Sequence, residues 1–199
     1  MRRNALTPAA APMLALGLLL AGCAELRAPQ AGQAIPVELL PASAEPLRAA
    51  ARMASADFVN EGAGLQDRPA EAARAFGRLE WMTAVLSTDP RYDALPPGIA
   101  MALRGAAAET REALGMVADT PPAQATAALA AVARDIDAGR APQFAPAVFP
   151  AGNERSLQRL TRPGPLPQAA IATGQAAEAI AQLDSGAGWV RGAGAGARF

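Results

Sequence analysis

The sequence contains no histidine and no lysine, and these two absences exclude several classes of catalytic site. Without histidine there is no imidazole general base, no Ser–His pair and no His-ligated zinc site. Without lysine there is no Schiff-base amine and no lysine to contact the phosphates in a nucleotide-binding loop. The chain also has one cysteine and one tyrosine, so carboxylates and hydroxyls are the main groups left for catalysis. We therefore predict a protein that is not an enzyme, holds no metal and needs no cofactor.

Excess charge of either sign is also missing. The 199 residues include 18 basic side chains, all of them arginine, and 18 acidic ones. Proteins that bind nucleic acid concentrate basic residues in a patch or stripe, and this sequence contains no such stripe. We therefore expect no nucleic-acid partner.

Long hydrophobic runs are scarce, and the longest lies near the N-terminus. Arg2 and Arg3 form a basic head, the apolar run spans 9–21, and small residues precede Cys23. This layout is typical of a secretory signal peptide, which we assign to 1–22. The run is interrupted by Pro12 and is shorter than the roughly 20 residues that a membrane-spanning helix needs.

The four residues Leu20-Ala21-Gly22-Cys23 resemble the lipobox of bacterial lipoproteins. This resemblance implies cleavage after Gly22, a diacylglyceryl thioether on Cys23, and an acyl chain such as palmitate on the new N-terminal amine. Two or more acyl chains anchor a protein stably, whereas one chain binds a membrane only marginally. The resemblance, with Ala24 following the cysteine, also implies a cell-envelope protein on the outer membrane that faces the periplasm.

Behind the cysteine, the sequence changes from a tether to a helical domain. Residues 23–43 contain three prolines and no helical apolar pattern, so we predict a lipidated cysteine followed by an extended tether. The apolar residues near its end, Ile35, Val37, Leu39 and Leu40, offer an alternative in which this part lies against the domain as an extended strap. The helical domain is predicted over 44–184, and a flexible Gly/Ala-rich tail over 185–199.

Apolar residues at helical spacing, with prolines and glycines between them, predict an all-α fold. We interpret the pattern as an antiparallel helical bundle of four main helices plus a short one, with the tether and a Pro-rich covering segment. Helical segments are predicted over 44–60, 69–87, 97–118, 121–138, 153–161 and 166–184.

Two segments between helices are candidates for a partner surface. One is the polar turn with Asp89, Arg91, Tyr92 and Asp93, which combines arginine and an aromatic side chain, as binding hot spots do. The alternative is a capped helix–helix connection with Tyr92 folded onto the core.

The second candidate is the proline-rich stretch 140–150 with Phe144 and Phe149. It could dock a partner in an extended conformation or close over an apolar groove, with the two phenylalanines exposed or lining the groove. The alternative is a segment that covers the open side of the helical domain.

Carboxylate pairs are the remaining option for acid–base chemistry. Glu109 and Glu112 are three residues apart and so share a helix face, but the chain lacks the histidines of di-metal bundle sites. A solvated polar face, balanced by Arg104 and Arg111, is the interpretation we prefer.

These observations predict a lipid-anchored cell-envelope protein that acts as a periplasm-facing interaction or structural module. Its expected partners are the membrane, through the lipid on Cys23, and an envelope protein. A carrier of an apolar ligand or lipid, held between helices under 140–150, is the alternative. An enzyme that uses two carboxylates is a third hypothesis.

Overall fold

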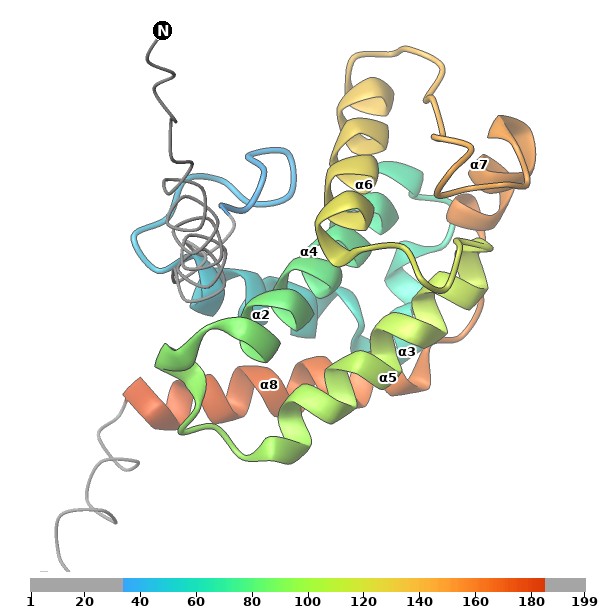
Figure 1. Ribbon diagram of the computed structural model, residues 1–199. Helices are drawn as coiled ribbons and strands as arrows, with labels where there is room; N and C mark the ends of the chain where they lie inside the picture. The colour runs from blue at the N-terminus through green and yellow to red at the C-terminus, as the bar shows by residue number, and fades with distance from the viewer. Residues whose placement is uncertain (1–33, 185–199) are drawn as a thin grey trace, which may run out of the picture. The chain divides into compact units, whose positions relative to one another are not determined.

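The computed structural model describes residues 34–184, which belong to one compact unit of the chain (Figure 1). Gly22 and Cys23, the rest of the leader, the start of the tether and the tail over 185–199 lie outside the described residues. The described part is all-helical and contains no strand, which confirms the predicted all-α class for it. Its α-helices are α2 (Pro46–Asp57), α3 (Val59–Gly62), α4 (Pro69–Thr88), α5 (Pro97–Leu114), α6 (Pro122–Asp137), α7 (Asn153–Thr161) and α8 (Pro167–Asp184).

Proline is the first residue of each of the five longest of these helices. The first helical position has no intrahelical partner for its N–H, and the proline ring holds φ near the helical value, so proline fits there. This explains why the predicted starts agree with the observed ones to within two residues. Two 3-10 turns, η1 (Ala63–Leu65) and η2 (Pro90–Tyr92), lie in the connections.

Two predicted helices end earlier than expected. The helix predicted over 97–118 stops at Leu114, because Gly115 adopts a left-handed backbone with φ of 63°. The helix predicted over 44–60 ends at Asp57, and Asn60 and Glu61 take positive φ angles of 51° and 58° in the short α3. Asparagine tolerates this conformation better than most residues, whereas glutamate rarely adopts it.

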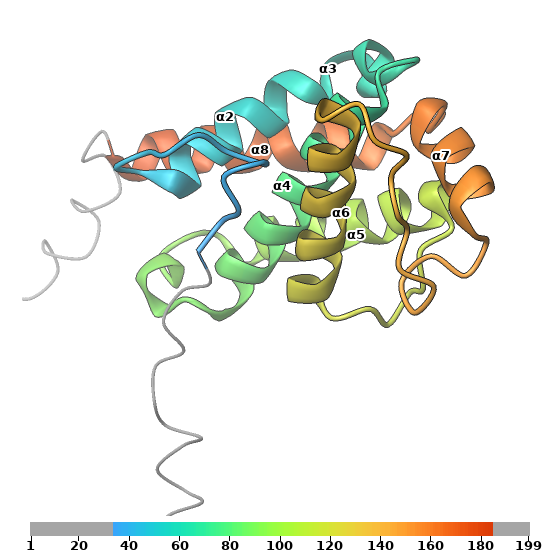
Figure 2. The same cartoon turned by 90° about the horizontal axis from the view of Figure 1, so that it is seen from above.

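Helix α4 lies at the centre of the packing. It contacts α6, α5 and α2, and Phe76, Leu79 and Met82 along it are fully buried. Helix α8 packs on α5, α2 and α3, and Figure 2 shows α2 alongside α8 and α6 alongside α4. Many of the buried contact positions are alanine, which lets neighbouring helices approach closely. Within residues 34–184 no helix is long and apolar enough to cross a membrane.

The end of the predicted tether lies against α4, as in the alternative of a strap. Pro36–Leu40 form a turn, closed by the N–H groups of Leu39 and Leu40 donating to the carbonyl of Pro36, so this part is not extended. Leu39 and Leu40 are buried, and the Leu39 side chain occupies the space that a side chain at Gly77 would fill. The strap is thereby part of the domain.

The proline-rich segment after α6 covers the helices. Phe144 and Phe149 are 3% and 1% exposed, and their rings meet edge to face at 5.1 Å between centroids. Val148, also buried, accepts a backbone hydrogen bond from Val117, which ties the segment to the connection between α5 and α6. The placement of the two phenylalanines is that of a covering segment rather than of an exposed docking surface.

Candidate functional site

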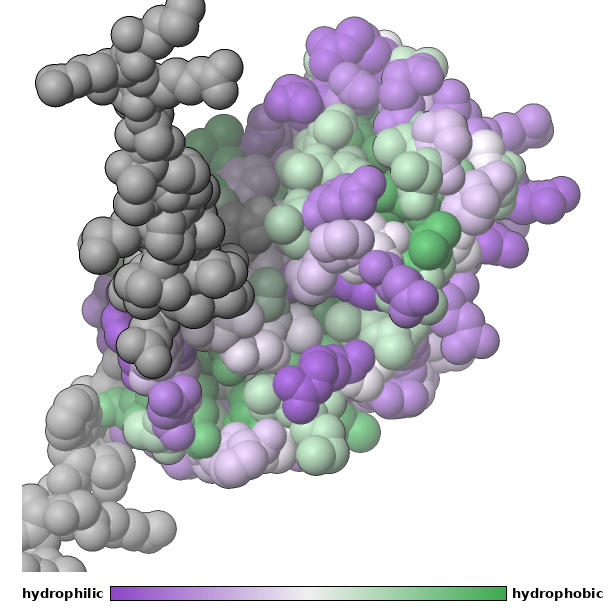
Figure 3. Space-filling view, viewed as in Figure 1, coloured by the Kyte–Doolittle hydropathy of each residue, from purple (hydrophilic) through white to green (hydrophobic). Residues whose placement is uncertain are grey.

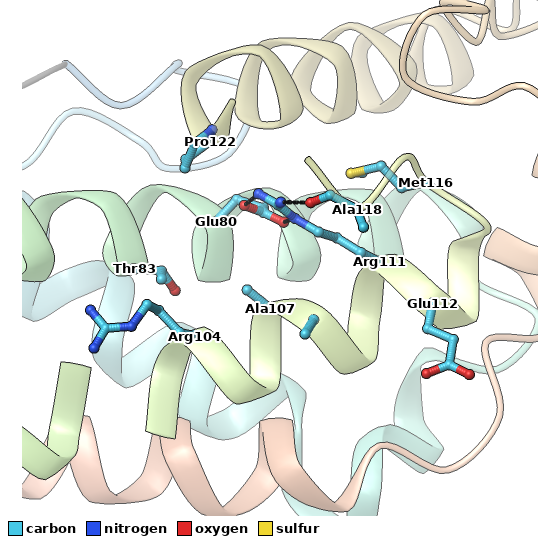
Figure 4. A pocket seen from close by; sticks show the side chains of 10 residues that line it. Glu80, Thr83, Arg104, Ala107, Arg111, Glu112, Met116, Ala118 and Pro122 are labelled. Carbon is cyan, nitrogen blue, oxygen red and sulfur yellow. Dashed lines mark hydrogen bonds and ion pairs between the residues drawn. The ribbon is translucent and has the colours of Figure 1, made fainter. Parts of the chain in front are cut away.

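A pocket among the described residues lies between α4, α5 and the start of α6. Its volume is about 670 Å³, within the range of roughly 300–1,000 Å³ that is usual for small-molecule sites. Figure 4 shows α4 and α5 on either side of it, with Pro122 at the start of α6 above. The lining residues are Glu80, Thr83, Arg104, Ala107, Ala108, Arg111, Glu112, Met116, Ala118 and Pro122.

A buried ion pair crosses the pocket from α4 to α5. The Nε and Nη2 atoms of Arg111 donate to the two carboxylate oxygens of Glu80, at 2.6 and 2.7 Å. The Glu80 side chain is 1% exposed and that of Arg111 is 14% exposed. Two parallel hydrogen bonds between a guanidinium and a carboxylate form the strongest type of charged pair, so both side chains have fixed positions.

Arg111 also fixes the loop that follows α5. Its Nη1 atom donates to the backbone carbonyl of Ala118 at 2.5 Å. The hydrogen bonds to Glu80 raise the pKa of Arg111 above its ordinary value, and partial burial opposes them. Arg111 therefore stays charged and holds α4, α5 and the α5–α6 connection together at one point.

The rest of the wall is mostly apolar and made of small side chains. Ala107 and Ala108 come from α5, and Met116, Ala118 and Pro122 come from the connection to α6 and its first residue. The Thr83 hydroxyl donates to the carbonyl of Leu79 within α4, so its hydrogen is already used. The pocket thus offers apolar contact with few free polar groups.

Two charged side chains, Arg104 and Glu112, lie at opposite ends of the α5 wall. Neither has an ion pair among residues 34–184, and the contact found for Arg104 is a long hydrogen bond of 3.5 Å to the Ser87 hydroxyl. Figure 4 shows the Glu112 carboxylate directed away from Arg104. The charge of Arg104 is therefore uncompensated beside the pocket.

In the polar turn predicted as a partner surface, some side chains are exposed and others are paired or partly buried. The Asp89 carboxylate accepts from the backbone N–H of Arg91 at 3.0 Å and pairs with its guanidinium, which lowers the pKa of Asp89. The Arg91 side chain is 73% exposed and lies over the Tyr92 ring, 5.6 Å from its centroid. Asp93 is exposed as well, and Tyr92 is half-buried.

A smaller pocket of about 240 Å³ adjoins this turn and is lined in part by Tyr92 and Asp93. The turn and the Phe144–Phe149 pair do not form one surface, because the two phenylalanines are buried. On the face drawn in Figure 3, hydrophobic side chains occur in small groups separated by polar ones.

Several carboxylates elsewhere in the described residues make structural contacts. The two oxygens of Glu109 accept from the backbone N–H groups of Gln168 and Ala169, at 3.1 and 2.9 Å, and so cap the start of α8. Asp135 pairs with Arg140 and Asp137 with Arg74. No group of three or more His, Cys, Asp or Glu side chains within residues 34–184 is placed to hold a metal ion.

The Glu80–Arg111 pair is not among the sites predicted from the sequence. The sequence does contain a signal for it. Glu80 stands between Leu79 and Trp81, and most of the residues next to it in the sequence are apolar. A charged residue almost never lies on a buried helix face unless it is paired. Its partner, 31 positions away, cannot be identified from spacing.

Comparison of the chain with protein-family models, with curated proteins and with solved structures finds no significant match. What the pocket can do therefore follows from its own residues. It can enclose an apolar body and place one free arginine beside it.

Proposed function

We propose that this is a lipid-anchored cell-envelope protein whose helical domain faces the periplasm. The proposal is supported by the lipobox Leu20-Ala21-Gly22-Cys23 behind a signal-peptide-like leader. The lipid on Cys23 would hold the chain to the membrane, most simply the outer membrane, and residues 24–33 would link it to the strap on α4. In the same proposal, the long helices form an antiparallel bundle that serves as a rigid scaffold.

We infer that the domain acts by binding rather than by catalysis, and that the pocket between α4 and α5 is the binding site. The pocket itself is the observation that supports this. Its buried acid, Glu80, is held by both oxygens in the pair with Arg111, which leaves it poorly suited to proton transfer, and its other acid, Glu112, is exposed to solvent. Its apolar wall suits a ligand with a hydrophobic body, as in the hypothesis of a carrier.

The position of this pocket differs from that expected for a carrier. The expected ligand site lay under 140–150 and was lined by phenylalanine and leucine, whereas Phe144 and Phe149 are packed in the core. Alanine, methionine and proline line the observed pocket instead. The proposal therefore places the ligand between α4, α5 and the start of α6.

An interaction module for an envelope protein is the second candidate. The turn with Asp89, Arg91, Tyr92 and Asp93 favours it, because an exposed arginine stacked on a tyrosine adjoins a small pocket. Arginine and tyrosine side chains contribute strongly at protein interfaces.

Mild crosslinking in intact cells, followed by purification of the full-length protein, tests the proposal. The peptide that contains Cys23 should carry lipid, and Cys23→Ser should release the protein from the membrane fraction. A copurifying lipid-like molecule supports the carrier, and one stoichiometric envelope protein supports the interaction module. An unmodified Cys23 would contradict the anchoring.

A further inference from the structure

The geometry points to a single-chain amphiphile with an anionic head group as the ligand of the pocket between α4 and α5. The head group would pair with Arg104, and the hydrocarbon chain would lie along the apolar wall. This inference rests on the proposed function, because it names the ligand of the same site.

The charges single out Arg104. Arg111 and Glu80 neutralise each other through two hydrogen bonds. Glu112 lies two helical turns beyond Arg104 and is directed away from it (Figure 4). One end of the pocket therefore carries an uncompensated positive charge, and a neutral or cationic ligand would leave that charge unused.

The donors of Arg104 are also available. Its guanidinium has five N–H groups, and its one contact among residues 34–184 is the 3.5 Å hydrogen bond to Ser87. Such a bond is at the weak limit of hydrogen-bond geometry. A carboxylate or a phosphate matches the guanidinium fork with two parallel hydrogen bonds, so either head group fits.

The wall is suited to a flexible chain. Ala107, Ala108 and Ala118 leave space that larger side chains would fill, and Met116 adapts its shape through three rotatable bonds. The hydrophobic effect adds affinity for each methylene that leaves water. A linear hydrocarbon beside a single cationic group is therefore the ligand shape that these residues favour.

Photoaffinity labelling of the full-length protein in its own membranes tests the inference. The probes are a long-chain alkyl carboxylate and the alcohol of the same chain length, each bearing a diazirine, with an alkyl phosphate as a third probe. Comparing variants at a fixed probe concentration cancels the partition of each probe into the membrane. Peptide mass spectrometry locates the label, which is expected within residues 80–122.

We expect Arg104→Gln to lower labelling by the carboxylate roughly two- to fivefold, because Arg104 is exposed and water weakens its ion pair with the head group. Labelling by the alcohol should not change. Arg155→Gln removes an exposed arginine on α7, outside the pocket, and should affect neither probe. Comparing the carboxylate with the phosphate identifies which anionic head group binds more tightly.

A variant that fills the pocket distinguishes a wrong head group from a wrong binding site. Ala108→Leu should lower labelling by both probes, whereas Ala127→Leu, on an exposed position of α6, should lower neither. If Ala108→Leu acts on both probes and Arg104→Gln on neither, the anionic head group is wrong and the binding site stands. If Ala108→Leu changes neither probe, the binding site itself is wrong.

Discussion

Glu80 of α4 and Arg111 of α5 share two hydrogen bonds of 2.6 and 2.7 Å across the pocket. The pair neutralises the only carboxylate that is buried in the pocket wall, and it positions the two helices that form the wall. Breaking a buried pair on one side leaves an uncompensated charge, whereas replacing both partners by apolar residues is often tolerated.

Arg111→Met should therefore lower the free energy of unfolding by about 3 kcal/mol, at the low end for buried pairs because Arg111 is partly exposed. The double variant Glu80→Met/Arg111→Met should recover most of this loss. Urea unfolding of the detergent-solubilised protein measures both. Equal losses in the single and double variants would contradict the view that the unpaired buried carboxylate of Glu80 causes the loss.

The exposed pair between Arg162 and Asp67 provides the control for that series. Its atoms are 3.5 Å apart and both side chains are largely exposed. Arg162→Met should change the free energy of unfolding by less than about 1 kcal/mol, as is usual for surface pairs. A loss as large as that of Arg111→Met would mean that the buried pair does not contribute more to stability than the exposed one.

The strap depends on the absence of a side chain at Gly77. A Cβ atom there would lie 2.7 Å from Cδ2 of Leu39, so Gly77→Ala should displace the strap and destabilise the protein by roughly 1–3 kcal/mol. Limited proteolysis should then cut near residues 36–40 sooner than in the wild type. Gly174→Ala, in open space on α8, should instead stabilise the protein by roughly 0.5–1 kcal/mol. If Gly77→Ala stabilised the protein as Gly174→Ala does, the contact between Leu39 and Gly77 would not hold the strap in place.

The cap on α8 gives a third prediction. Glu109→Ala leaves the N–H groups of Gln168 and Ala169 without their acceptor, and should lower the free energy of unfolding by roughly 1–2 kcal/mol. Glu112→Ala, on the same helix, removes an exposed carboxylate and should cost less than about 0.5 kcal/mol. Thermal unfolding followed by circular dichroism compares them, and equal shifts would contradict the capping role.

Asp57 gives a prediction for pH. Burial raises the pKa of Asp57 above its ordinary value of 3.8, and its ion pair with Arg78 opposes part of this rise. The folded state then binds this proton more tightly than the unfolded state, so the stability contributed by Asp57 is greatest below pH 3.8 and is lost as the pH rises through the raised pKa. The free-energy difference between the wild type and Asp57→Asn should decrease as the pH rises across this window.

Asp89 should behave in the opposite way. Its hydrogen bond with the Arg91 side chain lowers its pKa, so its contribution is present above pH 3.8 and is lost as the pH falls through the lowered pKa. The difference between the wild type and Asp89→Asn should therefore increase as the pH rises. If the two free-energy differences changed in the same direction as the pH rises, burial would not be the dominant influence on the pKa of Asp57.

The sequence predicted the helices well because local signals define them. Prolines at first helical positions and a glycine such as Gly139 after α6 determine where helices start and end without reference to the rest of the chain. The predicted helix over 97–118 includes Gly115, whereas the observed α5 ends before it, because glycine commonly ends helices in a left-handed conformation.

The pocket could not be predicted in the same way, because its parts lie far apart in the sequence. Glu80 and Arg111 are on different helices, and Glu109 lies three residues before the pocket residue Glu112 yet contacts α8. Which carboxylate is paired, which caps a helix and which is exposed depends on how the helices pack. Phe144 and Phe149 illustrate the same limit, since their segment is irregular and only packing decides whether it is exposed.

Native mass spectrometry of the full-length protein, extracted gently from its own membranes, tests most directly whether the pocket between α4 and α5 is a binding site. The wild type and Ala127→Leu should each carry a non-covalent, lipid-like molecule in addition to the covalent lipid on Cys23, and Ala108→Leu should have lost that molecule. Bare wild-type protein, or a molecule that Ala108→Leu retains in full, would contradict the account.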